Sequence, residues 1–267
     1  MAGSLQGKTA VITGSISGIG LGFERALAAQ GCAIMLNGFD DATAIEELRA
    51  GLAAEFSVPV FYNDADMRDP AAIVAMIADA DDRLGKVDIL INNAGIQHRE
   101  PVETFPTQKW DEMLAVNLSA PFHAIRAVLP QMRARNWGRI INTASTNALV
   151  GTPGLVCYTA TKHGLLGLTK VVALEVIETG ITCNAICPGT VRTNMSEHRI
   201  DAFAKELGVS KADALDDYIA QKQPYHQPMG RFITVEEIAA AAVYLCSDAA
   251  AAVRGAAFTV DGGWTAR

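Results

Sequence analysis

The sequence is poor in charged and aromatic residues, which make up 19% and 6% of its 267 positions, and its net charge is −7. A negative balance disfavours an extended polyanion such as nucleic acid as a partner. No apolar run reaches the roughly 18 residues that a membrane-spanning helix needs, and residues 1–7 hold no apolar signal core. We therefore expect a cytoplasmic protein that binds neither nucleic acid nor membranes.

The cysteines do not form a recognisable framework. They are odd in number and scattered along the chain, unlike the paired cysteines of a disulfide-rich domain. Cys183 and Cys187 are separated by three residues but have no second pair that would complete a metal site. We expect neither disulfide bonds nor a metal ion. The five are Cys32, Cys157, Cys183, Cys187 and Cys246.

Half of the residues are apolar, which is enough for one well-packed α/β domain over residues 1–267. Short β-branched runs alternate with helical patterns along the chain. Nearly continuous apolar strands indicate a parallel sheet with helices on both faces, and right-handed crossovers then give a doubly wound sheet of the Rossmann type. Strands are predicted at 9–13, 33–37, 59–63, 88–92, 139–143, 182–186 and 257–260, and helices at 18–30, 41–56, 70–84, 107–135, 154–180 and 235–246.

Residues 194–227 do not follow this alternation. They are polar, have a helical pattern and lie between two βα units. A segment of this kind is typical of a mobile lid or of a surface insertion. We expect a small helical lid over the substrate.

A glycine-rich turn, Thr13-Gly14-Ser15-Ile16-Ser17-Gly18-Ile19-Gly20, joins the first predicted strand to the first helix. Gly14 permits a tight turn, Gly18 lets the backbone approach a pyrophosphate, and Gly20 lets helix and strand pack closely. The amino end of a helix attracts phosphate without a net basic charge. This turn predicts a dinucleotide site.

Tyr158 and Lys162 are four residues apart in a helical stretch, so their side chains share one face. A free phenol, with a pKa near 10, is a poor base at neutral pH. An ammonium about 4 Å away at an effective dielectric of about 20 supplies roughly 4 kcal/mol, or about three pKa units. We expect Lys162 to lower the pKa of Tyr158, and Ser145, after the fifth strand, to polarise a substrate carbonyl.

The glycine spacing and several later motifs resemble those of the short-chain dehydrogenase/reductase family, over the full length of the chain. Asn92-Asn93-Ala94-Gly95 matches the second cofactor motif, Asn117 the helix asparagine, Ser145, Tyr158 and Lys162 the Ser…Tyr-x-x-x-Lys site, and Pro188-Gly189 the motif after the sixth strand. The resemblance implies an alcohol/carbonyl oxidoreductase that is usually a homotetramer. In this family the asparagine that Asn117 matches holds a water that relays protons, and the lysine that Lys162 matches also binds the nicotinamide ribose.

The end of the second predicted strand informs the choice of cofactor. Gly38 takes the place of the acid that often holds the adenosine ribose. Asp40 and Asp41 would repel the 2′-phosphate of NADP, and we expect no cation nearby that could bind it. We therefore predict NAD as the cofactor. The family motifs imply a cofactor site made of Gly14, Ser15, Ser17, Gly18, Ile19, Gly20, Phe39, Asp66, Met67, Asn93, Ala94, Gly95, Tyr158, Lys162, Pro188, Gly189, Val191 and Thr193.

Several stretches, including Gly95-Ile96-Gln97-His98 and Val260-Asp261-Gly262-Gly263-Trp264, resemble bacterial D-3-hydroxybutyrate dehydrogenases. In that group a glutamine, a histidine and a lysine help to hold the substrate carboxylate. Gln97 matches the glutamine, whereas Asn147 and Leu155 take the places of the histidine and lysine. A second resemblance is to gluconate 5-dehydrogenases, where an arginine follows the asparagine motif, and Arg99 is then a bidentate partner for a carboxylate.

These observations predict an NAD-dependent oxidoreductase that interconverts a secondary alcohol and a ketone on a small, 3-hydroxybutyrate-like hydroxy acid. A sugar-acid or polyol dehydrogenase is the main alternative. A catalytically silent dinucleotide sensor, and a lyase or epimerase on a related scaffold, are more remote ones. The expected substrate residues are Gln97, Arg99, Ser145, Asn147, Leu155, Tyr158 and His198.

Overall fold

A parallel sheet of seven strands forms the centre of the computed structural model, which describes residues 5–218 and 228–266. The strand order β3-β2-β1-β4-β5-β6-β7 confirms the predicted doubly wound Rossmann-type architecture. The strands are β1 (Thr9–Ile12), β2 (Ala33–Asn37), β3 (Val60–Asn63), β4 (Ile89–Asn92), β5 (Gly138–Thr143), β6 (Ile181–Pro188) and β7 (Ala257–Val260).

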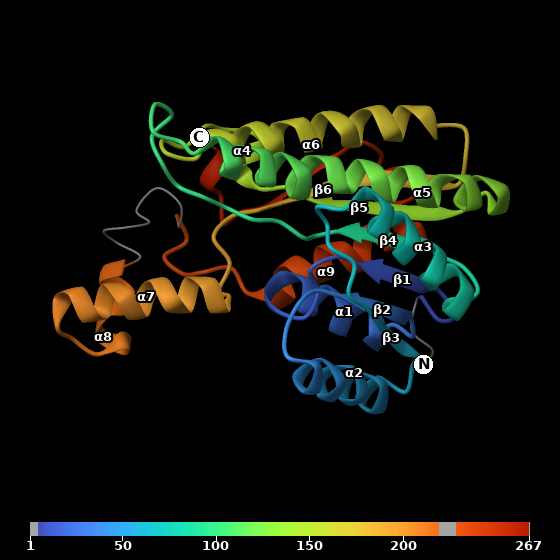
Figure 1. Ribbon diagram of the computed structural model, residues 1–267, viewed down its shortest axis with the longest axis horizontal. Helices are drawn as coiled ribbons and strands as arrows, with labels where there is room; N and C mark the ends of the chain where they lie inside the picture. Colours follow the sequence, from blue (N-terminus) through green and yellow to red (C-terminus); the bar gives the residue numbers. More distant parts are fainter. Residues whose placement is uncertain (1–4, 219–227, 267) are drawn as a thin grey trace.

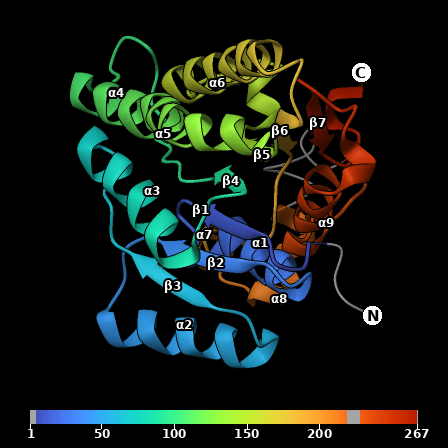
Figure 2. The ribbon, with the colours of Figure 1, turned by 90° about the vertical axis from the view of Figure 1, so that its right-hand side faces the viewer.

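Helices cover both faces of the sheet (Figures 1 and 2). Phe23 and Leu27 of one layer, and Met76 and Val128 of the other, are fully buried against the strands. The first layer contains α1 (Gly18–Ala29), α2 (Ala42–Phe56) and α9 (Val235–Cys246). The second contains α3 (Pro70–Leu84), α5 (Ala120–Arg135) and α6 (Val156–Glu175), with α4 (Thr107–Leu114) preceding α5.

Strand β1 lies where the strand order reverses. Ala10 of β1 pairs in parallel with Ile34 of β2 on one side and with Ile89 of β4 on the other. The segments that follow β1 and β4 therefore turn away from each other at the carboxyl edge of the sheet. Ligands of open α/β sheets bind at such a switch point.

Two predicted helices differ from the observed ones. The helix predicted over 107–135 is interrupted by the π-helix η1 (Ala115–Ser119), which separates α4 from α5. The helix predicted over 154–180 is shorter at both ends, since α6 begins at Val156, after an isolated parallel bridge between Leu155 and Glu100, and ends at Glu175. Short 3₁₀ helices occur at η2 (Thr146–Ala148), η4 (Asp248–Ala250) and η5 (Trp264–Ala266).

The segment predicted as a lid contains α7 (Asn194–Leu207) and α8 (Lys211–Asp217), and its residues 219–227 lie outside the described part of the chain. The two helices project from one end of the sheet (Figure 1) and share a small apolar cluster that includes Ile200, Phe203 and Ala214. They therefore pack mainly on each other.

Neither 5–218 nor 228–266 contains a helix that is long and apolar enough to cross a membrane. The same residues bring together no group of three or more His, Cys, Asp or Glu side chains suited to a metal ion. All five cysteines are buried with free thiols.

Candidate active site

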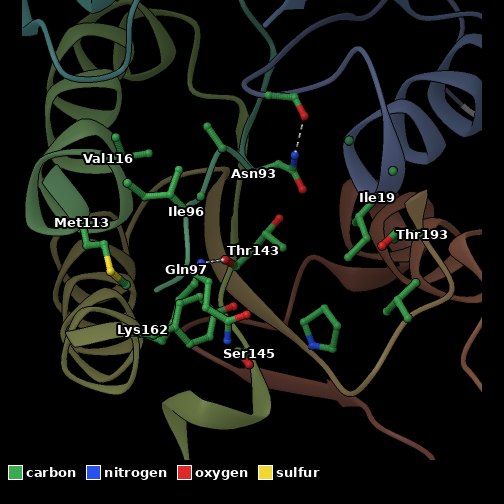
Figure 3. A pocket seen from close by; sticks show the side chains of 18 of the residues that line it. Ile19, Asn93, Ile96, Gln97, Met113, Val116, Thr143, Ser145, Lys162 and Thr193 are labelled. Carbon is green, nitrogen blue, oxygen red and sulfur yellow. Dashed lines mark hydrogen bonds between the residues drawn. The ribbon is translucent and has the colours of Figure 1, made fainter. Parts of the chain in front are cut away.

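A cleft of about 930 Å³ opens at the carboxyl edge of the sheet. Its walls include the segments after β1, β2, β3, β4, β5 and β6 and the starts of α6 and α7. In Figure 3, Gln97, Ser145 and Lys162 gather in one part of this cleft, and Ile19 and Thr193 face it from the other side. Among the described residues, the lining contains every predicted cofactor and substrate residue except Ser15 and His198.

The glycine-rich turn fits a dinucleotide pyrophosphate. Gly14 has φ +60°, and a Cβ on it would lie 2.9 Å from Ala94 Cα. A Cβ on Gly20 would lie 2.3 Å from the carbonyl oxygen of Gly14. Helix α1 begins at Gly18, and its N-cap residue Ser17 makes no side-chain cap hydrogen bond. The first-turn amides therefore face the cleft without a capping side chain, as anion binding requires.

Ser15, predicted to contact the cofactor, is fully buried beneath this turn. Its hydroxyl accepts a hydrogen bond of 3.0 Å from the backbone N–H of Asn37. The Asn37 side-chain oxygen in turn accepts from the Gly14 N–H at 3.1 Å. Ser15 and Asn37 thus hold the turn in shape, and Asn37, which lines the cleft, was missed because no spacing rule singles it out.

Asn93 ties β4 to β1 beside the turn. Its side-chain amide donates to the carbonyls of Thr13 and Gly14 at 3.0 and 2.8 Å, and the Thr13 hydroxyl accepts from the N–H groups of Asn93 and Ala94. Figure 3 shows Asn93 in this position at the back of the cleft. Asn93 and Thr13 thus join the ends of β4 and β1 beside the turn.

The far end of the cleft follows β2 and β3. Gly38 stands where an acid was expected, with φ +153° and a hypothetical Cβ only 2.8 Å from Ile16 Cγ1. Phe39 is 63% exposed at this end. The expectation of no nearby cation is wrong, since Arg68 also lines the cleft. Its guanidinium donates to Asp66 at 3.0 Å, which lowers the pKa of that carboxyl.

Tyr158 and Lys162 come from the first half of α6, and Ser145 from the end of β5. Lys162 is buried, and its ammonium donates to the Thr143 carbonyl oxygen at 2.7 Å. Nζ lies 5.5 Å from the centre of the Tyr158 ring. The Ser145 hydroxyl oxygen accepts from the Asn147 N–H at 3.1 Å and caps η2.

The predicted effect of Lys162 on Tyr158 is not found. Burial raises the pKa of Tyr158, and only a hydrogen bond with Ser145 and the positive charge of Arg199 oppose that rise. Burial also lowers the pKa of Lys162 to about 8. Although the two side chains share a helix face, the ammonium donates its hydrogen bond to the carbonyl at the end of β5.

Asn117 sits in the π-helix η1 and is fully buried. Its side-chain oxygen accepts from the Ile96 N–H, and its amide donates to the Ile96 carbonyl, both at 2.9 Å. π-helical turns are frequent at functional sites. Here the asparagine fixes the loop after β4 through Ile96. A Cβ on Gly95 would lie 3.4 Å from Asn117 Oδ1 and 3.6 Å from Lys162 Nζ, so this glycine keeps space beside both.

The loop after β4 forms the outer wall with the loop before α6. Arg99 is exposed and donates to the Pro153 carbonyl oxygen at 3.0 Å. Asn147 accepts from the Thr152 hydroxyl at 2.6 Å, and Leu155 is buried in the same wall. Arg99, Asn147 and Leu155 therefore line the same wall of the cleft, and their role in substrate binding stays a prediction.

His198, predicted as a substrate residue, is exposed outside the cleft. Its neighbour Arg199 lines the cleft instead, and donates to the Gln97 side-chain oxygen at 3.0 Å. Successive residues of a helix point about 100° apart, so one residue of offset decides which side chain enters the site. The sequence pointed to the stretch Glu197-His198-Arg199, but it did not show which of these side chains α7 directs into the cleft.

Comparisons with known proteins agree along the whole chain. A family model described as "Enoyl-(Acyl carrier protein) reductase" matches residues 14–265. The chain is 47% identical to a D-beta-hydroxybutyrate dehydrogenase of Cupriavidus necator over 264 residues, 98% of this chain and 100% of the relative. It is 35% identical to a gluconate 5-dehydrogenase of Gluconobacter oxydans, over 98% and 96%. L-sorbose reductase of Gluconobacter frateurii, solved with NADPH and L-sorbose, superposes with a TM-score of 0.93 at 32% identity, covering 100% of both chains.

Proposed function

Because this chain belongs to the short-chain dehydrogenase/reductase family, we propose that it interconverts a secondary alcohol and a ketone on a small 3-hydroxybutyrate-like acid, with NAD. One observation carries the proposal: Ser145, Tyr158 and Lys162 meet in one part of a cleft whose other part is a phosphate-binding glycine turn. The 47% identity to a D-beta-hydroxybutyrate dehydrogenase supports the hydroxy-acid class.

The dinucleotide fits the cleft by the shape of the glycine cradle and the uncapped amino end of α1. The amides of Ser17–Gly20 would hold its pyrophosphate, Phe39 and Met67 its adenine end, and Asn93–Gly95 with Pro188–Thr193 its nicotinamide end. When bound, the nicotinamide supplies the hydride acceptor for oxidation and the hydride donor for reduction. NAD is favoured over NADP because Arg68 is engaged by Asp66 and because Asp40 and Asp41 follow β2.

The protein's own groups handle the oxygen and its proton. The Ser145 hydroxyl hydrogen-bonds the reacting oxygen, and the adjacent Tyr158 phenol gives it a proton during reduction or removes one during oxidation. A raised pKa keeps the phenol protonated at neutral pH, which suits it as the acid for carbonyl reduction. Lys162, with a pKa of about 8, exchanges protons near neutral pH, and Asn117 holds the loop beside it in place.

A sugar acid is the second candidate substrate class. Arg99 lines the cleft as the sequence resemblance predicted, and the chain is 35% identical to a gluconate 5-dehydrogenase. Both candidate classes carry a carboxylate beside a secondary alcohol. They differ in length, so substrate turnover separates them.

The test is a screen of NADH formation by the purified protein with both enantiomers of 3-hydroxybutyrate, gluconate, sorbitol and 2-butanol. We expect one enantiomer of 3-hydroxybutyrate to give the highest kcat/KM. Tyr158→Phe protein serves as the control for adventitious activity. Efficient turnover of sorbitol or gluconate, with no turnover of either enantiomer of 3-hydroxybutyrate, would overturn the proposed substrate class while leaving the family assignment intact.

We also infer that the chain assembles as a homotetramer, as the family resemblance implies. α5 and α6 lie side by side in both ribbon views, and they expose large apolar side chains at Phe122, Val171 and Leu174. Apolar groups gathered on a surface mark association sites. Light scattering on the eluting protein should give a tetramer mass, and Leu174→Glu should reduce it. A monomer mass for the unchanged protein would contradict the inference.

A further inference from the structure

We propose that Arg199 of α7, oriented by Gln97, is the cation that receives the carboxylate of the substrate. This rests on the proposed function, because it assumes a small acid bound beside Tyr158. It assigns the recognition of the acid to the helical segment 194–218 and not to the walls contributed by the sheet.

The position of Arg199 carries the inference. Its guanidinium donates to Gln97 Oε1 at 3.0 Å, across the opening between α7 and the loop after β4. Figure 3 shows Gln97 beside Ser145 and Lys162. Burial raises the pKa of Tyr158, and the charge of Arg199 partly opposes that rise, so the guanidinium lies within electrostatic reach of the reacting group. A carboxylate attached near the reacting carbon would lie in the same space.

The chemistry of the group suits a second ligand. A guanidinium has five N–H donors in a planar fork, so it can hold the Gln97 amide and a carboxylate at once. The carboxylate would then be bound by charge-assisted hydrogen bonds, while Gln97 fixes the direction of the fork. Gln97 is in this sense a positioning residue.

Of the three predicted substrate residues in the neighbouring wall, only Arg99 carries a positive charge. Asn147 presents an amide whose oxygen is engaged by Thr152, and Leu155 presents a buried alkyl side chain. Neither side chain carries a positive charge. An ion pair with a carboxylate in this part of the cleft therefore depends on an arginine, either Arg99 of this wall or Arg199 of α7.

The other cations in the cleft are less suited to the substrate. Arg68 is paired with Asp66 and lies at the adenine end, and Lys109 is paired with Glu112 at 2.8 Å. Lys162 is buried and donates to Thr143. Arg99 is the nearest rival, but it donates to the Pro153 carbonyl, and its charge does not contribute to the pKa of Tyr158.

The experiment compares Arg199→Gln, which keeps a polar chain but removes the charge, with Arg199→Lys, which keeps the charge. Arg199 is exposed in the structure without substrate. With 3-hydroxybutyrate as substrate, we expect kcat/KM of Arg199→Gln to fall at least about tenfold, the loss typical of removing a hydrogen bond between charged groups. With the uncharged methyl ester it should fall less than about threefold, which the carboxylate interaction predicts because the ester lacks the charge. Arg199→Lys should retain part of the preference for the acid.

Lys205→Gln is the matched control. Lys205 lies on the same helix, is exposed and is outside the cleft lining, so its removal changes the charge of α7 without touching the site. It should leave both substrates unaffected. A second readout is the pH at which ester oxidation reaches half its maximum, which Arg199→Gln should move upward because a positive charge near Tyr158 is lost.

Butyrate inhibition separates the failure of this inference from the failure of the proposed function. Butyrate carries the carboxylate but no alcohol, so it can be tested as a competitor against whichever alcohol the enzyme oxidises. We expect butyrate to inhibit the unchanged protein and Lys205→Gln, and to inhibit Arg199→Gln at least about tenfold more weakly. Equal inhibition of all three, or equal losses for acid and ester, would overturn the role of Arg199 even if 3-hydroxybutyrate is the substrate.

Discussion

The ammonium group of Lys162 donates a 2.7 Å hydrogen bond to the backbone carbonyl of Thr143. This bond joins α6 to the carboxyl end of β5, next to the serine that caps η2. The lysine is thereby held at a fixed place in the cleft, and its own pKa falls to about 8 because it is buried. Lys162 is thus a buried cation near its titration point.

Tyr158→Phe should remove turnover and leave dinucleotide binding intact. The phenol is the proton-transfer group in the proposed mechanism, and a positioned acid or base contributes about 10²–10⁴-fold to a rate. We expect kcat to fall by that factor, while titration of NADH fluorescence gives an unchanged dissociation constant. A correctly folded variant that keeps a tenth of the activity would contradict the role of Tyr158.

Lys162→Met should change how stability depends on pH. The folded-state pKa of Lys162 is lowered, so below about pH 8 its charge costs stability, and the cost disappears as the pH rises toward the unfolded value of 10.5. A shift of this size corresponds to about 3 kcal/mol at most. Relative to the variant, the unchanged protein should therefore gain stability between pH 7 and pH 10, measured by urea unfolding.

Lys170→Met, at an exposed position of the same helix, is the control for this measurement. The free energy of unfolding of this variant should change with pH in the same way as that of the unchanged protein. If the stability difference between Lys162→Met and the unchanged protein is independent of pH, the lysine is not the buried cation described above.

The cofactor preference should follow the residues after β2. We expect kcat/KM with NAD to exceed that with NADP by at least about tenfold, equivalent to about 1.4 kcal/mol. Phe39→Arg should reduce the ratio of kcat/KM with NAD to kcat/KM with NADP, since it places a cation at an exposed position in the part of the cleft that follows β2. Equal efficiencies in the unchanged protein would show that Arg68 leaves Asp66 to bind a 2′-phosphate.

Gly38→Asp should not strengthen NAD binding, although an acid is common at this position in dinucleotide enzymes. The backbone at Gly38 has φ +153°, and a Cβ there would lie 2.8 Å from Ile16 Cγ1. We expect a lower melting temperature and a weaker dissociation constant for NADH. Tighter binding with unchanged stability would show that the loop accommodates a side chain.

Arg99→Ala should have a small effect on acid turnover. Arg99 is exposed and its guanidinium already donates to the Pro153 carbonyl, so a charge pair made by it should contribute up to about 1 kcal/mol and kcat/KM should fall no more than about fivefold. Arg99→Lys is the matched variant that keeps the charge. A hundredfold loss confined to acids would move the carboxylate site from Arg199 to Arg99 and favour the sugar-acid alternative.

The sequence by itself determined the parts of this protein that depend on local spacing. Alternating strand and helix patterns predicted all seven strands, because buried parallel strands are continuous apolar runs. The glycines of the first turn, and the four-residue interval between Tyr158 and Lys162, follow from backbone geometry alone. These features require no knowledge of distant contacts.

Tertiary structure decided where the ends of the side chains meet. Ser15 belongs to the turn motif, yet its hydroxyl faces Asn37 of β2, 22 positions away. Lys162 shares a face with Tyr158 but donates to β5. Arg199 lies 102 positions from Gln97 and reaches it only because α7 leaves the sheet at the cleft. Spacing fixes the direction in which a side chain leaves its helix or strand, whereas the partner at its far end depends on how those elements pack.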